Sequence, residues 1–192
     1  MNEQIAAILA RIRYLEDELG KEVEKERMCY GPTLKKNVAE FQQGVLVQHR
    51  RLRMGLIQFF RETPTLNLLT SPVIYSLLGP LALLDIWVTI YQHICFRAYG
   101  IPRVTRSEYV VIDRHRLSYL NLIEAINCAF CGYANGVISY AREIAGRTEQ
   151  HWCPIKHALR IRDPHARYLK FMEYGDAEGY RSKLEEYRKN VD

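Results

Sequence analysis

Residues 71–96 read SPVIYSLLGPLALLDIWVTIYQHICF, and this stretch decides how the rest of the chain is organised. It contains one formally charged residue, Asp85, and neither lysine nor arginine. As a helix it would be about 39 Å long at ~1.5 Å per residue, whereas the hydrocarbon core of a bilayer is roughly 30 Å thick. The stretch therefore predicts a membrane anchor, kinked at the Gly79-Pro80 step.

The flanks of this anchor are both positively charged. Residues 1–70 hold eleven Lys/Arg against nine Asp/Glu, and residues 97–192 hold sixteen against twelve. Because an excess of Lys and Arg marks the cytoplasmic side, two positive flanks favour a segment that enters and leaves on the same side, bending at Gly79-Pro80. A single crossing with one basic flank outside is the alternative. A single apolar segment excludes a polytopic transporter.

The region before the anchor predicts helices. Apolar residues recur at steps of three and four over residues 3–28 and again over residues 33–61, and Gly31-Pro32 separates the two runs. We therefore expect an antiparallel helical hairpin in residues 1–62, suited to self-association or to a protein partner. The basic cluster at residues 49–53 lies close to the anchor, so we expect it to contact lipid headgroups, and we expect no nucleic-acid partner.

Polar residues within and just after the anchor are candidates for function. Asp85 and His93 are two helical turns apart and could point to the same protein surface, either as ordinary polar contacts or in a proton or metal function. The five arginines that follow predict a collar at the membrane surface, and residues 113–116 could alternatively bind a phosphate or carboxylate group. The collar comprises Arg97, Arg103, Arg106, Arg114 and Arg116.

The cysteines predict a metal site in a C-terminal helical domain, residues 97–192. Cys128 and Cys131 form a C-x2-C pair on a helix expected over residues 117–146, and Cys153 and His157 follow as C-x3-H. Three cysteines and one histidine suit a closed tetrahedral zinc site, provided that the helix ends and the chain turns back. Iron or an iron–sulfur cluster, with Cys95 as a further ligand, is the alternative cofactor.

Two other interpretations of these residues remain open. The cysteines could simply pack in the core, or Cys128 and Cys131 could serve in thiol–disulfide exchange. Gly132 and Gly136 lower the helix propensity of this segment, which makes sense if another helix or a bound group comes close. A charged helix over residues 177–189 is expected to close the domain.

Residues 133–158 (YANGVISYAREIAGRTEQHWCPIKHA), with IYQHICFRAYGIPRV before them and YGDAEGY after them, resemble a family of proteobacterial membrane-associated proteins. The resemblance covers roughly residues 71–180. It implies a bacterial inner-membrane setting, with most of the chain facing the cytoplasm, and transfers no catalytic residue. The cysteine usage and the lack of a signal peptide at the N-terminus agree with a reducing compartment.

Together these features predict an all-α protein with a helical hairpin in residues 1–62, an anchor in residues 63–96 and a Cys/His domain in residues 97–192. The leading function is a membrane-anchored, metal-stabilised scaffold that assembles a membrane complex. A membrane-bound iron-dependent oxidoreductase or electron carrier is the main alternative. A lipid-modifying enzyme that uses residues 113–116 is a third.

Overall fold

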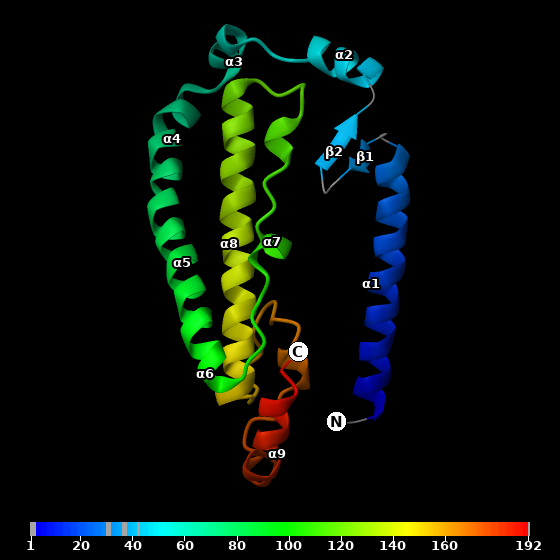
Figure 1. Cartoon of the computed structure of the whole chain (residues 1–192), viewed down its shortest axis with the longest axis vertical. Helices are drawn as coiled ribbons and strands as arrows, with labels where there is room; N and C mark the ends of the chain where they lie inside the picture. Colours follow the sequence, from blue (N-terminus) through cyan, green and yellow to red (C-terminus); the bar gives the residue numbers. More distant parts are fainter. Residues whose placement is uncertain (1–2, 30–31, 36–37, 42, 192) are drawn as a thin grey trace.

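A computed structural model of the chain describes residues 3–29, 32–35, 38–41 and 43–191. Apart from loops and one short hairpin of two strands, these parts are helical, so the predicted all-α class is confirmed. The elements appear in Figure 1 in the order α1 (Glu3–Cys29), β1 (Pro32–Lys35), β2 (Val38–Phe41), α2 (Gln43–Arg51), α3 (Leu56–Glu62), α4 (Thr65–Ser76), α5 (Leu78–Tyr91), the π-helical turn η1 (Gln92–Phe96), α6 (Arg97–Tyr99), α7 (Arg106–Tyr109), the 3-10 turn η2 (Arg114–Arg116), α8 (Leu122–Trp152), the 3-10 turn η3 (Tyr168–Lys170) and α9 (Ala177–Lys189).

The predicted anchor lies inside a continuous run of helix, Thr65–Tyr99, formed by α4, α5, η1 and α6 placed end to end (Figure 1). We call this run the apolar segment. Its regular pattern is interrupted at Leu77, because Pro80 has no N–H to offer the carbonyl of Ser76 and its ring crowds that carbonyl. The chain continues in the same direction beyond the interruption, so the predicted re-entrant bend at Gly79-Pro80 is wrong.

The other long helix, α8, runs beside the apolar segment and in the same direction. Tyr75 contacts Asn127 and Tyr91 contacts Thr148, so residue numbers increase in the same direction along both helices. An Asn121–Glu124 capping box starts α8, in which the Asn121 carboxamide oxygen accepts from the backbone N–H of Glu124 at 3.0 Å.

Two parallel helices need a connection that returns along their length. Residues 100–121, which we call the return segment, provide it. Gly100 begins the return in the left-handed conformation, with φ of 70°. Most of the returning chain is not helical and lies directly on α8. A Cβ atom at Gly136 would stand 2.8 Å from the carbonyl oxygen of Tyr109, and one at Gly132 would stand 3.2 Å from that of Val111. The predicted close approach at these glycines is confirmed, although a non-helical chain makes it.

Around the lower end of α8 in Figure 1, the C-terminal region closes a small core. The predicted last helix is confirmed as α9, which Asp176 caps by accepting from the backbone N–H of Gly179 at 2.8 Å. The buried hydrophobic residues of this core come from η1, the return segment, α8 and the C-terminus: Phe96, Ile101, Val104, Tyr140, Ile144 and Val191.

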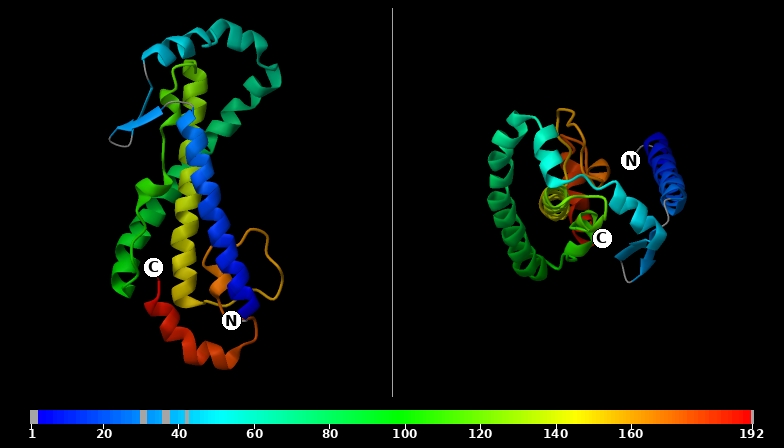
Figure 2. Two further views of the ribbon diagram at one scale, coloured as in Figure 1. Left: turned by 90° about the vertical axis from the view of Figure 1, so that its right-hand side faces the viewer. Right: turned by 90° about the horizontal axis from the view of Figure 1, so that it is seen from above.

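The N-terminal region matches the prediction only in part. The helix predicted over residues 3–28 is α1, but the helix predicted over residues 33–61 is replaced by the β1–β2 hairpin and the two short helices α2 and α3. β-branched Thr33 and Val38 stand in the two strands, and Gly55 takes an extended conformation between α2 and α3. The predicted antiparallel helical hairpin is therefore wrong, and α1 stands apart from α8 and the apolar segment (Figure 2).

The packing of the return segment on α8 predicts the effect of Gly136→Ala. The added methyl would meet backbone atoms at 2.8 Å, so we expect a loss of about 1–3 kcal/mol in the free energy of unfolding, measured by chemical denaturation. Gly20→Ala in α1 is the matched control. It has open space around it and should be neutral or stabilise by up to ~1 kcal/mol. Equal effects at the two sites would contradict the described packing.

Candidate functional site

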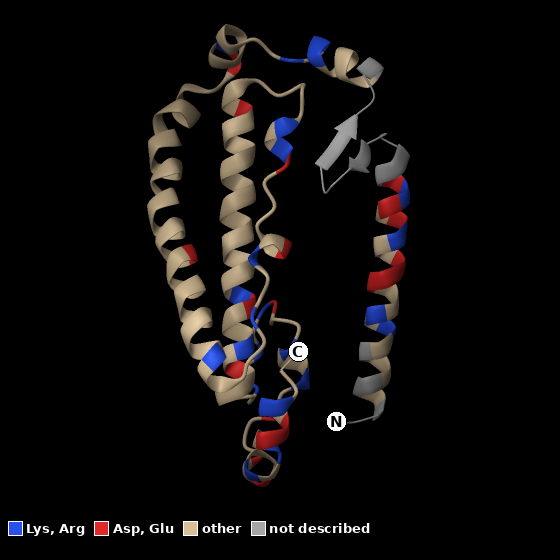
Figure 3. Cartoon of the chain, in the orientation of Figure 1, with Lys and Arg blue, Asp and Glu red and all other residues tan. Residues whose placement is uncertain are grey.

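The outward side of the apolar segment carries a row of exposed apolar side chains. They follow one another at steps of three and four residues, with Pro80 filling the one wider gap, and are between 47% and 77% exposed. No charged residue interrupts the row, and Figure 3 shows how little charge lies along α4 and α5. We call these residues the outer stripe: Leu66, Leu69, Val73, Leu77, Leu83, Trp87, Ile90 and Ile94.

The opposite side of the same segment holds its one acidic residue. Asp85 is 7% exposed and receives two hydrogen bonds from the guanidinium of Arg106, at 2.9 Å from Nε and 2.7 Å from Nη2. The hydroxyl of Tyr133 on α8 donates to the same carboxylate at 3.1 Å. Burial, and then the hydrogen bond to Asp85, raise the pKa of Tyr133 above its ordinary value of 10.0, so this phenol stays a donor.

Gln92 holds the return segment about two helical turns after Asp85. Its side-chain oxygen accepts from the N–H of Val104 at 2.9 Å, and its amide nitrogen donates to the Val104 carbonyl at 3.3 Å. The same nitrogen also donates to the hydroxyl of Tyr140, a fully buried residue of α8. One buried amide thus satisfies both backbone groups of an extended residue, as a neighbouring strand would.

Together with Tyr75–Asn127 and Tyr91–Thr148, these contacts form a series of polar links along the inner side of the apolar segment. The polarity of α4–α6 is therefore inverted relative to a surface helix of a soluble protein, since its buried polar side chains, Asp85 and Gln92, face the protein while the outer stripe faces outward. Such an arrangement fits a helix whose outer solvent is not water.

His93 does not join Asp85 as predicted. Its side chain is exposed, and its Nδ1 lies 2.7 Å from the carbonyl oxygen of Thr89 in its own helix. The partner of Asp85 is Arg106, which the sequence assigned to the lipid-facing collar. The other collar residues, Arg97, Arg103, Arg114 and Arg116, are exposed, as are Asp113 and His115 beside them, so residues 113–116 form an open turn.

The predicted metal ligands lie far apart along α8. The helix does not end near residue 146 but continues to Trp152, so Cys131 and Cys153 are separated by 22 residues, about 33 Å at ~1.5 Å per residue. Gly146, which looked like a helix end, instead makes room for His165, whose Nδ1 would lie 3.1 Å from an added Cβ. One ion cannot bind both ends of this helix.

Each end of α8 accordingly holds only part of the predicted set. Cys128 and Cys131 are free thiols one turn apart, and Cys95 and Cys153 are also free. His157 lies beyond the helix, where its ring stacks on Tyr168. Within the described part of the chain, no group of three or more His, Cys, Asp or Glu could hold a metal ion. Zinc, or iron as its alternative, stays a prediction that this arrangement does not support.

A partly buried cluster of charges fixes the loop after α8 onto that helix, and no local sequence pattern predicted it. Glu143 accepts from Arg147 and from Arg167, both at 2.8 Å, and Glu149 pairs with His165 at 2.9 Å. Burial alone would raise the pKa of Glu143, but its hydrogen bonds from Arg147 and Arg167 outweigh burial and lower that pKa. The cluster is structural, because its charged groups bind one another.

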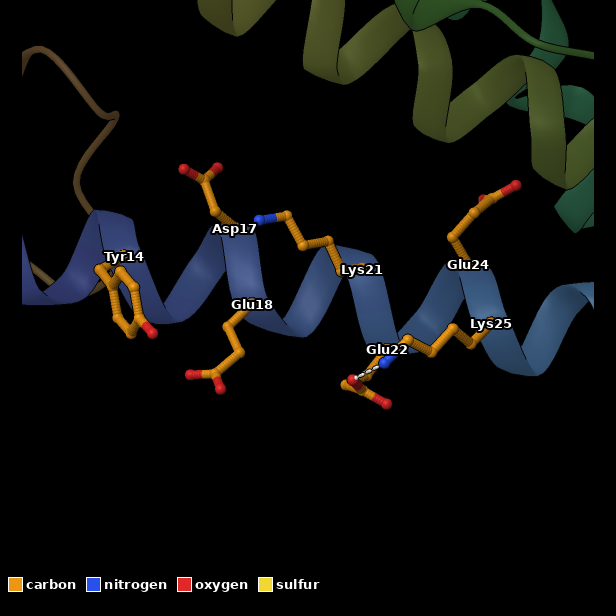
Figure 4. Close-up of a pocket in the computed structure, with 7 residues that line it drawn as sticks. All are labelled: Tyr14, Asp17, Glu18, Lys21, Glu22, Glu24 and Lys25. Carbon is orange, nitrogen blue, oxygen red and sulfur yellow. Dashed lines mark hydrogen bonds and ion pairs between the residues drawn. The ribbon is translucent and has the colours of Figure 1, made fainter.

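The surface of α1 between Tyr14 and Lys25 is mostly charged and open. Figure 4 shows these side chains radiating from the helix in several directions, with Lys25 and Glu22 paired within one turn. They do not converge on a common point, as ligand-binding groups would.

No protein-family model, curated protein or solved structure matches this chain. Its function has to be argued from its own geometry.

Removal of Arg106 tests the polar contact at Asp85. Arg106→Ala leaves a carboxylate buried without its cation and should lower the free energy of unfolding by about 3 kcal/mol. Asp85→Asn leaves a neutral amide, and an arginine whose side chain is 43% exposed, so about 1 kcal/mol is expected. Arg103→Ala is the control, because Arg103 is an exposed arginine of the same return segment as Arg106. Thermal and chemical unfolding in mild detergent measure all three, and equal losses for Arg106→Ala and Arg103→Ala would contradict the contact.

Proposed function

We propose that this chain is a membrane-attached helical scaffold, held to the bilayer by the outer stripe and joined to other proteins through α1. The observation that carries the proposal is the inverted polarity of the apolar segment. The run has 35 helical residues, and its most apolar 18 residues have a mean hydropathy of 1.9 with only 6% of them buried within the chain. Water would penalise that much exposed apolar surface, whereas lipid would not.

The bilayer is the occupant that this surface fits best. The outer stripe is continuous and free of charge, and Trp87 lies within it, a side chain that favours the boundary between lipid and water. Arginines stand at both ends of the segment, at Arg61 before α4 and at Arg97 in α6, where they can meet anionic headgroups. We place the protein at the bacterial inner membrane, with most of the chain facing the cytoplasm.

The second part of the proposal concerns α1. Its apolar residues form one row at steps of three and four and are between 42% and 64% exposed: Ile8, Ile12, Leu15, Leu19 and Val23. An amphipathic helix that leaves its apolar row uncovered is suited to packing against another helix.

We propose a second copy of the chain as the partner of α1. Arg11 and Glu16 flank the row at positions that face each other across a parallel pair of helices. Arg11 of one copy would then lie beside Glu16 of the other, twice in each dimer. The scaffold function follows from combining the two surfaces, since a dimer attached to the membrane can hold other components together. The oxidoreductase alternative needed cysteines gathered around iron, and the described arrangement separates them.

Vesicle flotation tests membrane attachment. The wild-type chain should float with vesicles that contain anionic lipid, and Val73→Glu with Ile90→Glu should reduce the bound fraction at least ~10-fold, since each charge in the apolar region costs about 2–3 kcal/mol. Leu159→Glu is the control, because this leucine is 82% exposed but lies in the loop after α8. A wild-type chain that stays in solution as a monodisperse species would contradict the proposal.

Analytical ultracentrifugation in detergent tests the role of α1. Leu15→Asp with Leu19→Asp should convert a dimer into a monomer, because two charges would face each other within the helix pair. Tyr14→Asp places the same acidic side chain on the opposite side of α1, at a residue that is equally exposed, and should leave the dimer intact. A wild-type chain that is monomeric at every concentration tested would refute self-association through α1.

A further inference from the structure

The depth at which the return segment lies restricts how the apolar segment can sit in a membrane. Its backbone is fixed to the apolar segment at Val104 by Gln92, and the side chain of Arg106 binds Asp85. Asp85 is 14 residues, about 21 Å at ~1.5 Å per residue, from the Tyr99 end, and about 30 Å from the Thr65 end. Residues 104–106 therefore lie well inside the length of the segment.

A crossing of the bilayer would carry this part of the chain into the hydrocarbon region. Arg103 and Glu108 are exposed there, and the backbone around them is mostly non-helical. Non-helical backbone is tolerated at that depth only where protein or a water-filled cavity surrounds it, and exposed charges are costly. The described parts of the chain bury Ile101 and Val104 but leave residues 105–108 exposed, so they do not enclose this part of the return segment.

The length of the outer stripe points the same way. From Leu66 to Ile94 it covers 28 residues, about 42 Å at ~1.5 Å per residue, against a hydrocarbon thickness of roughly 30 Å. A crossing would leave apolar side chains in water at one or both ends. A helix that lies in the plane of the membrane can bury a stripe of any length.

The two sides of the molecule also differ as an in-plane arrangement requires. The outer stripe is apolar along its whole length, whereas α8, on the far side of the apolar segment, exposes Asn135 and Arg142. Viewed from above in Figure 2, the apolar segment forms the outermost layer of one side, and neither α1 nor α9 covers it.

We propose that the chain lies along one leaflet, with the apolar segment parallel to the membrane surface and the outer stripe inserted at the boundary between headgroups and acyl chains. The return segment and α8 then face water on the far side of the apolar segment. This inference rests on the proposed membrane attachment and specifies its geometry. It also accounts for the positive charge of both flanks, because both remain on the same side without any bend at Gly79-Pro80.

The depth of single tryptophans distinguishes lying along the membrane from crossing it. Trp152→Phe leaves Trp87, which lies between the two ends of the outer stripe, as the one tryptophan. Adding Trp87→Phe together with either Leu69→Trp or Ile94→Trp moves the tryptophan towards one end or the other. Each of these positions is an exposed apolar site, and circular dichroism would confirm unchanged helicity. The probes are vesicles of anionic lipid with bromine atoms either near the headgroups or near the ends of the acyl chains.

If the segment lies in the plane, all three tryptophans are quenched more strongly by the shallow bromines, with shallow-to-deep ratios that agree within about twofold. If it crosses, the deep bromines quench Trp87 most strongly while positions 69 and 94 favour the shallow ones, and the in-plane geometry is refuted. A chain that floats with vesicles but shows the crossing pattern would refute only the geometry. A chain that neither floats nor is quenched at any position would refute the attachment and the geometry together.

Discussion

The contact between Asp85 and Arg106 is the constraint on which the rest of the structure depends. A buried carboxylate must be paired, and its partner here comes from a segment that follows it by 21 residues. That requirement forces the chain after α6 to return along the apolar segment. Tyr133 completes the site from α8, so the same carboxylate also determines which side of the apolar segment faces that helix. The Asp85 carboxylate thus orients three elements at once.

Because Asp85 faces the protein, the outer stripe on the opposite side of the helix is left exposed. In water, a helix gains stability by hiding its apolar residues and exposing its polar ones. The apolar segment does the reverse, with Asp85 and Gln92 buried and the outer stripe exposed. If lipid covers the outer side, the exposed outer stripe no longer costs free energy, and the polar links on the inner side hold the rest of the chain. The proposed membrane attachment and the internal packing would then both follow from one helix.

Much of the fold could be predicted from local patterns. The apolar segment, α1 and α9 are indicated by their hydrophobic periodicity or their composition. Gly132 and Gly136 predicted that another helix or a bound group packs closely on α8. The candidate site was less predictable, because its partners are distant in sequence. Nothing local to Arg106 distinguishes it from the other arginines of the collar. The apolar pattern from Val38 to Phe60 predicted a helix. The β-branched residues near its start instead form a hairpin, and Gly55 separates two short helices. The structure does not bring the predicted metal ligands together, because the prediction ended the helix at Gly146. The helix instead continues to Trp152, and Gly146 is a packing site for His165.

The central claim, that the apolar segment turns its polar side to the protein and its apolar side to lipid, can be tested directly by photocrosslinking in vesicles. A diazirine-bearing residue would replace Leu83 on the outer stripe or, in a separate protein, Val88, which packs against the core. The two positions belong to the same helix and have similar aliphatic side chains. We expect the probe at residue 83 to label lipid and the probe at residue 88 to label other segments of the chain. Lipid labelling at residue 88, or labelling of protein alone at residue 83, would contradict the account.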